Sequence, residues 1–192
     1  MYRLAFKRIF DIVVSAVALL LLAPFFLLIA AIVRLESPGP ALFRQDRLGQ
    51  GGSVFTLYKF RTMSHAPRVV SREIFADNPE LTRTGRWLRR LKIDELPQLW
   101  NVLRGDMSLV GPRPAMPEQI EVLNADGRRR LEVRPGLTGL AQVNGNIHLP
   151  WEERWRYDRR YVEEISFRLD AGILWKTIAV IVLGEDAFKD SE

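Results

Sequence analysis

The chain has 192 residues, which suffices for one domain of ordinary size with a small attachment. It contains no cysteine, which excludes disulfide bonds and thiolate metal sites, and its two histidines argue against a histidine-based zinc site. The net charge of +5 points to anionic partners: nucleic acid, phosphorylated metabolites or an anionic membrane surface.

Residues 12–33 carry no charge and are almost entirely apolar, and a bilayer is spanned by about 20 such residues. Basic residues flank this run on both sides; they are Arg3, Lys7, Arg8, Arg34, Arg44 and Arg47. Positive residues favour the cytoplasmic side, so a straight span would leave one basic flank outside. Pro24, near the middle of the run, removes a helical hydrogen bond and bends the axis. From the residues alone, a re-entrant membrane helix over residues 1–35 that breaks at Pro24 and a kinked spanning helix remain equally open.

Residues 41–47 and 54–63 have the composition of two strands, and the glycine-rich segment between them is typical of a hairpin turn. On the second strand Lys59 and Arg61 are two positions apart, so their side chains share one face. This basic face is either an ordinary solvated surface or the lining of a site that binds an anion.

Residues 84–91 are predicted to form a helix capped by Thr84, with arginines interleaved among Trp87 and Leu88. Such a helix can lie on lipid headgroups, or it can be an ordinary amphipathic surface helix. Arg86 is near enough to Asp94 in sequence to hold a phosphate or to orient a carboxylate.

Asp94 and Glu95 precede an apolar pattern with helical spacing, which predicts a helix that Asp94 caps and that stops at Gly105. Pro97 suits the first turn of that helix. Carboxylates and phosphates both favour the positive end of the helix dipole. A carboxylate pair beside a phosphate calls for a divalent cation, which predicts Mg²⁺ bound by Asp94 and Glu95. The alternative is that the pair only caps a helix.

The segment Gly111-Pro112-Arg113-Pro114 is a stiff turn that carries a single guanidinium. Arginine suits planar two-point recognition of phosphate. We therefore expect Arg113 to bind an anionic part of a substrate, with Pro112 and Pro114 holding it in place.

The remaining chain contains further predicted elements. Residues 140–143 are expected to form a short strand, and residues 151–164 a charged helix. Asp170 is placed to cap a final helix that runs to Leu183. Residues 173–182 are strongly apolar but too short to span, so they either lie on the membrane or fill the core.

Several of these motifs together resemble the bacterial sugar transferase family, the monotopic phosphoglycosyl transferases. They are Asp94-Glu95-Leu96-Pro97-Gln98, Asn101-Val102-Leu103, Gly105-Asp106-Met107-Ser108, Gly111-Pro112-Arg113-Pro114, Tyr58-Lys59-Phe60-Arg61-Thr62-Met63 and Arg134-Pro135-Gly136-Leu137-Thr138-Gly139-Leu140. The resemblance covers nearly the whole chain. With the pattern above, it implies an α+β fold, mainly helical with a small β-hairpin, a re-entrant N-terminal membrane helix and interfacial amphipathic helices. Residues 36–192 would form a catalytic domain on the cytoplasmic face of the bacterial inner membrane.

The resemblance also implies a reaction. The chain would move a phosphosugar from a UDP-sugar to polyprenol (undecaprenyl) phosphate and release UMP, as the first membrane step in assembling a glycoconjugate such as exopolysaccharide or O-antigen. Asp94 would carry the phosphosugar covalently, Glu95 would help to hold Mg²⁺, and Lys59 and Arg61 would line the active site. The expected partners are polyprenol phosphate, a nucleotide diphosphate sugar, anionic lipids and a second copy of the chain.

This chain departs from the family at two positions. Ala23 precedes Pro24 where family members carry serine, and Asn146 stands where they often carry arginine, so a nucleotide contact of that arginine is not transferred. Two other classes of function remain to be weighed: a membrane-tethered basic nucleic-acid-binding protein and an adaptor without catalysis. No zinc motif, RNP motif or recognition helix supports nucleic-acid binding, so no nucleic-acid partner is expected.

Overall fold

The computed structural model describes residues 2, 6–64 and 80–183; Arg3, one of the basic residues flanking the apolar run, lies outside them. Its α-helices are α1 (Lys7–Glu36), α2 (Arg83–Arg90), α3 (Leu99–Arg104), α4 (Ala125–Arg129), α5 (Trp151–Glu164) and α6 (Phe167–Leu183). Short 3₁₀ helices are η2 (Gln50–Gly52), η3 (Ile93–Gln98), η4 (Pro117–Glu121), η5 (Arg130–Glu132), η6 (Gln142–Asn144) and η7 (Asn146–His148). The strands are β1 (Leu42–Leu48), β2 (Val54–Phe60), β3 (Ser108–Val110) and β4 (Gly136–Thr138). The predicted fold class, α+β and mainly helical with a small hairpin, is confirmed.

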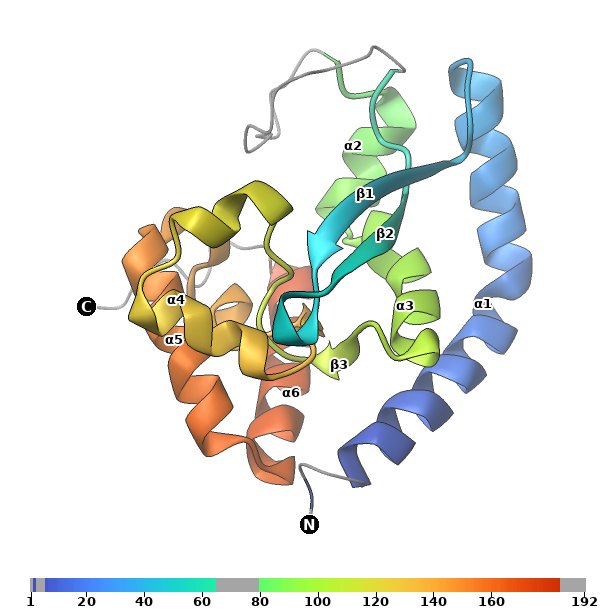
Figure 1. Ribbon diagram of the computed structural model, residues 1–192. Coiled ribbons are helices and arrows are strands. Elements are labelled where there is room, and N and C mark those ends of the chain that lie inside the picture. The colour runs from blue at the N-terminus through green and yellow to red at the C-terminus, as the bar shows by residue number, and fades with distance from the viewer. Residues whose placement is uncertain (1, 3–5, 65–79, 184–192) are drawn as a thin grey trace.

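Two small sheets form the centre of the molecule (Figure 1). Strands β1 and β2 make the predicted antiparallel hairpin, with Leu42 opposite Phe60 and Leu48 opposite Val54. Strands β3 and β4 pair in parallel. A Cβ at Gly136 would collide with the backbone of Gly111, so glycine is required where these two segments approach each other. This close approach fixes the start of the Pro112-Arg113-Pro114 turn.

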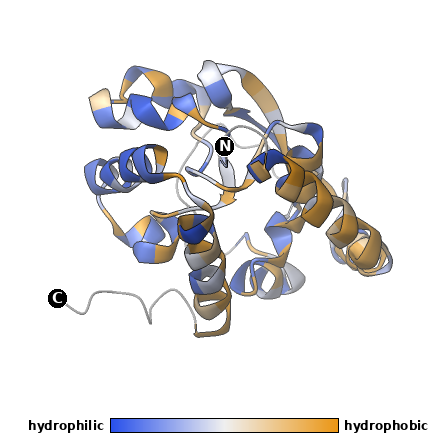
Figure 2. Ribbon diagram, turned by 90° about the horizontal axis from the view of Figure 1, so that it is seen from below, coloured by the Kyte–Doolittle hydropathy of each residue, from blue (hydrophilic) through white to orange (hydrophobic). Residues whose placement is uncertain are grey.

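Helix α1 is long and apolar enough to cross or enter a membrane, and much of its apolar surface is exposed. Figure 2 shows this helix as hydrophobic along most of its length. The helix continues through Pro24, where we expected a break, and its ribbon bends along its length instead (Figure 1). A bend is what a proline inside a helix produces when one hydrogen bond is lost. The re-entrant topology and the domain boundary after residue 35 stay predictions.

Side chains near both ends of α1 contact the rest of the chain through hydrogen bonds or apolar packing. Near its start, Arg8 donates hydrogen bonds to the carbonyl oxygens of Val102 (2.6 Å) and Leu103 (2.9 Å) at the end of α3. One turn later the Asp11 carboxylate accepts from the Ser108 hydroxyl (2.7 Å) and the Leu109 amide (3.1 Å). Toward its other end, Ile29 and Val33 are buried in a cluster with Phe60 and Leu88. The anchor helix is therefore packed along the domain.

The main core lies between the hairpin, α3, the short parallel strands, α5 and α6. Its buried members include Leu57, Val102, Met107, Tyr161 and Ile173. Helix α5 has the predicted bounds of residues 151–164. Ile173 and Val180 of α6 are buried, whereas Trp175, Ile178, Val182 and Leu183 are exposed, so the helix both fills the core and presents an apolar face.

Three local predictions were wrong. Thr82, not Thr84, caps α2, because its hydroxyl accepts from the Gly85 amide at 2.9 Å. Residues 140–143 do not form a strand; η6 lies there. Asp170 does not cap α6 but lies inside it, where its carboxylate accepts from Tyr2 (2.6 Å), Lys7 (2.6 Å) and Tyr161 (2.9 Å).

Candidate active site

Asp94 and Glu95 lie in the first turn of η3, directly after α2. The chain turns between the two helices at Lys92, which has a left-handed backbone with φ 56°. Asp94 is thus inside the helix and does not cap it, which corrects the predicted N-cap. The predicted stop is confirmed, because Gly105 ends α3 with φ 99°. Because η3 packs against β2, both carboxylates are held under the hairpin, and Asp94 is only 6% exposed.

Two cations neutralise Glu95. Lys59 Nζ and Arg113 Nη2 each lie 2.8 Å from the same oxygen, Oε1. Burial alone would raise the pKa of Glu95, but the charges and hydrogen bonds of Arg113 and Lys59 hold that pKa well below its usual range. Glu95 is therefore ionised and already paired.

Asp94 has the opposite surroundings. Within the described ranges, no hydrogen bond or ion pair engages its carboxylate, although the side chain is buried. Burial raises its pKa, and the negative charge of Glu95 raises it further, while Lys59 and Arg89 act in the other direction. A buried carboxylate without a partner is costly, and such groups gather at functional sites.

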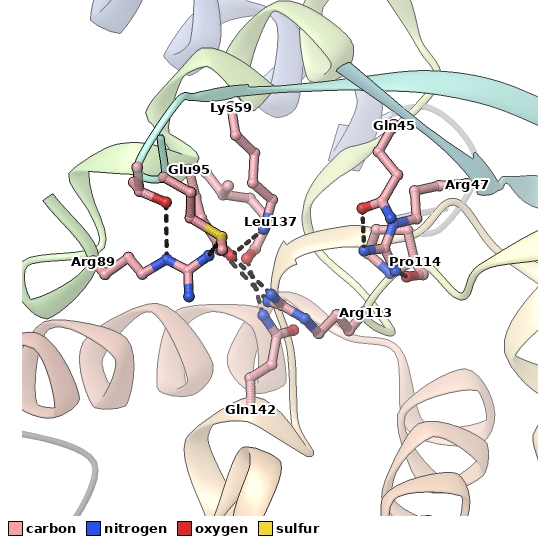
Figure 3. A network of polar contacts seen from close by, with 11 residues as sticks. Gln45, Arg47, Lys59, Arg89, Glu95, Arg113, Pro114, Leu137 and Gln142 are labelled. Carbon is pink, nitrogen blue, oxygen red and sulfur yellow. Dashed lines mark hydrogen bonds and ion pairs between the residues drawn. The ribbon is translucent and has the colours of Figure 1, made fainter. Parts of the chain in front are cut away.

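The cations around Asp94 and Glu95 come from three separate elements, and Figure 3 shows those around Glu95. Lys59 is on β2, and burial lowers its pKa even though Glu95 opposes the shift. Arg89 is on α2, where its Nε donates to the Thr62 hydroxyl at 3.0 Å. Arg113 follows β3, and its Nη2 donates to Glu95 Oε1 at 2.8 Å. The structure therefore brings Lys59, Asp94, Glu95 and Arg113 together as the sequence predicted.

Two predicted substrate-binding residues are elsewhere. Arg86 is exposed on α2, and it is Arg89 that turns toward the carboxylates. Arg61 is 5% exposed and binds the C-terminal end of α1, where it donates to the carbonyls of Val33 (3.0 Å), Ser37 (2.6 Å) and Pro38 (2.6 Å). A guanidinium suits the negative end of a helix. We therefore propose that Arg61 binds the end of α1 and does not contact the substrate.

The turn that carries Arg113 is rigid, as predicted. Pro112 and Pro114 are buried, and the amide of Gly111 donates to Thr138 of β4 at 2.9 Å. The carbonyl of Arg113 accepts from Arg130 at 2.8 Å, while the Arg113 side chain is 40% exposed. The backbone is thus fixed while the guanidinium remains open to solvent and to a ligand.

The two carboxylates differ in how well they fit a magnesium ion. Asp94 offers oxygens that no described residue engages, and magnesium is commonly held by one or two carboxylates together with substrate phosphates. Glu95 has its Oε1 between two cations, which disfavours a metal at the same oxygen. No group of three acidic or histidine ligands occurs in the part of the chain that the structure describes. Asp94 therefore fits as a magnesium ligand, and Glu95 in this arrangement does not.

A buried carboxylate with cations around it, which no described residue engages, marks a candidate functional site. The comparison with known proteins identifies the family. The chain belongs to the bacterial sugar transferase family, whose model matches residues 2–184. It is therefore a transferase, as the resemblance implied.

Three relatives illustrate the match. The chain is 44% identical over 179 residues to the uncharacterized sugar transferase EpsL of Bacillus subtilis, covering 93% of this chain and 88% of the relative. It is 43% identical over 194 residues to the UDP-glucose:undecaprenyl-phosphate glucose-1-phosphate transferase of Caulobacter vibrioides, covering 95% and 72%. It is 36% identical over 198 residues to the undecaprenyl-phosphate galactose phosphotransferase of Salmonella typhimurium, covering 95% and 41%.

Sequence reasoning missed Arg89, Arg47 and Gln142. The side of α2 that faces the site is set by the packing of Gly85 on Thr62, where a Cβ would collide with the Thr62 backbone, and the sequence does not show this contact. Arg89 follows one turn later on the same side. Gln142 lies beside Arg113 (Figure 3), and its Oε1 is buried without a hydrogen-bond partner. No local pattern in the sequence points to Gln142.

Proposed function

We propose that this protein is a phosphoglycosyl transferase that moves a phosphosugar from a UDP-sugar to undecaprenyl phosphate and releases UMP. The observation that carries this proposal is the Asp94 carboxylate, which is buried and engaged by none of the described residues, beside a neutralised Glu95. The names of the Caulobacter and Salmonella relatives support undecaprenyl phosphate as the acceptor. Family membership sets aside the adaptor and nucleic-acid-binding alternatives, since neither requires a transferase site.

In the first step Asp94 is the nucleophile, as the family resemblance implies. An Asp94 oxygen attacks the donor phosphorus that bears the sugar, forming an acyl phosphate, and the bond from that phosphorus to UMP breaks with its electrons going to UMP. Nucleophilic attack requires the ionised carboxylate. In the second step an oxygen of the acceptor phosphate attacks the same phosphorus, and the Asp94 carboxylate leaves. The acceptor is already anionic, so no strong general base is needed.

The surrounding cations stabilise the charge that develops on the phosphoryl oxygens. Lys59, Arg89 and Arg113 converge on the two carboxylates from different elements, so their positions are fixed before substrate arrives. Glu95 keeps Lys59 and Arg113 in place by pairing with both. Magnesium, when bound by Asp94 and the substrate phosphates, would polarise the phosphoryl group.

We also propose that the active site faces the cytoplasm at the level of the lipid headgroups. Both ends of α1 contact the same domain, through Arg8 at one end and Arg61 at the other. This supports an anchor whose ends share one face of the membrane, since a straight span would place these contacts on opposite sides. A shallow anchor suits a reaction between a soluble diphosphate and a phosphate on a lipid.

Cysteine labelling tests this topology cleanly because the chain has no native cysteine. Phe6→Cys and Arg44→Cys, made separately, are expected to resist a membrane-impermeant thiol reagent in intact cells and to react after the cells are lysed. Labelling of either variant in intact cells would show a spanning helix instead.

The reaction is tested by mass spectrometry of the enzyme mixed with a panel of UDP-sugars and magnesium, without acceptor. One donor is expected to add the mass of a phosphosugar to the peptide that contains Asp94, with a burst of about one UMP per enzyme. Asp94→Asn should show neither, whereas Asp46→Asn, an exposed position on β1, should behave as wild type. UMP release that requires acceptor, with no adduct, would show direct transfer without a covalent intermediate.

A further inference from the structure

Arg47 is a partly buried cation near the site that the reaction above does not use. It lies on β1, and its guanidinium is held by two neutral oxygens. Nη1 donates to the carbonyl of Pro114 at 3.1 Å, and Nη2 donates to Oε1 of Gln45 at 2.6 Å. Figure 3 shows Arg47 beside Pro114, with Arg113 between Arg47 and Glu95 in this view. One rigid turn thus separates two guanidinium groups.

Among the described residues, Arg47 has acidic groups only at longer range, since Glu95 and Glu118 act on its charge without contacting it. No carboxylate within the described ranges forms an ion pair with it, and its Nε is buried without a hydrogen-bond partner. Burial lowers the pKa of Arg47 to about 10, and the positive charge of Arg113 adds to the shift. Leaving a buried cation without a counterion is costly, and an anionic ligand would remove that cost.

The neighbouring arginines differ from Arg47 in this respect. Arg113 pairs with Glu95, and Arg130 pairs with Asp158 at 2.9 Å. Both therefore have an acidic partner already, whereas Gln45 orients Arg47 without neutralising it. A guanidinium that is oriented but not neutralised is suited to binding an oxyanion.

A nucleotide diphosphate sugar brings two phosphoryl groups to this site. The phosphorus attacked by Asp94 would lie near Lys59 and Arg89, whose charges act on that carboxylate. Arg47 is close enough to Arg113 and Glu95 for their charges to act on it, which makes it a candidate to contact the second phosphoryl group of the same diphosphate. We propose that Arg47, oriented by Gln45, binds the phosphate that leaves with UMP. This inference rests on the proposed function and adds to it a residue that contacts the leaving group.

Experiment can distinguish two other roles for Arg47 from binding of the leaving group. The same guanidinium chemistry would serve the phosphate of the lipid acceptor. Alternatively, Arg47 only stabilises the Arg113 turn through the carbonyl of Pro114. The leaving-group role predicts a loss of UMP affinity, the acceptor role a loss of acceptor affinity, and the stabilising role neither.

The experiment uses the full chain in detergent or nanodiscs, with Arg47→Gln, Arg47→Lys and the control Arg44→Gln. Arg44 is exposed on the same strand. Calorimetry measures binding of UMP, UDP and uridine, and steady-state assays measure KM for donor and for acceptor. In Arg47→Gln the Kd for UMP and UDP and the KM for donor are expected to rise about tenfold or more, because a hydrogen bond to a charged group is lost. Affinity for uridine, which has no phosphate, and KM for acceptor should be unchanged.

Arg47→Lys keeps the charge but loses the fork, so a smaller loss of UMP affinity is expected, and this variant replaces Arg47→Gln if that one does not fold. Arg44→Gln should match wild type throughout. The inference is overturned if UMP affinity is unchanged while the melting temperature falls, or if only the KM for acceptor rises. If the wild type itself releases no UMP from any donor, the proposed function fails, and the inference fails with it.

Discussion

Asp94 and Asp170 are both buried carboxylates, but their surroundings are opposite. Asp170 accepts hydrogen bonds from Tyr2, Lys7 and Tyr161 and so joins the start of the chain to α5 and α6. Asp94 accepts none from the described residues, and burial together with Glu95 raises its pKa. Burial alone therefore does not separate the structural carboxylate of Asp170 from the carboxylate proposed to react at Asp94. What separates them is whether the protein itself supplies the partners.

The largest expected effect is on activity at Asp94. Asp94→Asn should lower kcat by roughly a thousandfold or more, because a neutral carboxamide is a poor nucleophile. The melting temperature should stay within a few degrees of wild type, since no described partner is lost. Activity assays and thermal unfolding of the same preparation check both statements. A large loss of stability would mean that Asp94 has a structural role after all.

Asp170 should show the reverse pattern. Asp170→Asn leaves Lys7 with its charge unpaired and the two tyrosines with a poorer acceptor, which is expected to cost about 3 kcal/mol. For a chain of this size that corresponds to a fall of roughly 6–12 °C in the melting temperature. Reconstituted, folded enzyme should keep a kcat near wild type. The exposed Asp46→Asn is the matched control and should change neither quantity.

The smallest expected effect is a shift in pH dependence. In the proposed mechanism Asp94 must be ionised to attack, and its pKa is raised, so kcat/KM should fall on the acid side at a higher pH than an ordinary aspartate would give. Glu95→Gln removes the negative neighbour and leaves Lys59 and Arg113 to act on Asp94 alone. Its acid limb should therefore move to lower pH, whatever its maximal rate. If the acid limb of kcat/KM lies at the same pH in Glu95→Gln as in wild type, a group other than Asp94 controls it.

The sequence predicted the features that depend on neighbouring residues. The glycines after β1 predicted the hairpin, and Gly105 marked the end of α3. Asp94, Glu95 and Arg113 were found because each belongs to a compact motif. Lys59 was identified because it belongs to the motif of residues 58–63 and lies on a strand that the sequence predicted.

The predictions that failed depend on contacts between distant segments. Arg61 reaches carbonyls of residues 33–38, far back in the chain, and no local pattern indicates this. The sequence named Arg86 but not Arg89, because the packing of Gly85 on Thr62 decides which side of α2 faces the site. Arg47 was noted only as a flanking charge, since its approach to Pro114 arises from tertiary structure.

The contacts of Arg61 have a consequence for the lipid environment. Arg61 binds the end of the anchor helix, and Lys59, two residues earlier on the same extended segment, binds Glu95. An extended chain rises about 3.3 Å per residue, so the helix end and the reacting carboxylates are coupled over a short, stiff connection. A change in how deeply the proposed re-entrant helix sits in the bilayer would be carried through Arg61 to Lys59. Turnover is therefore expected to vary with the acyl-chain length of the host lipid, even for a saturating donor.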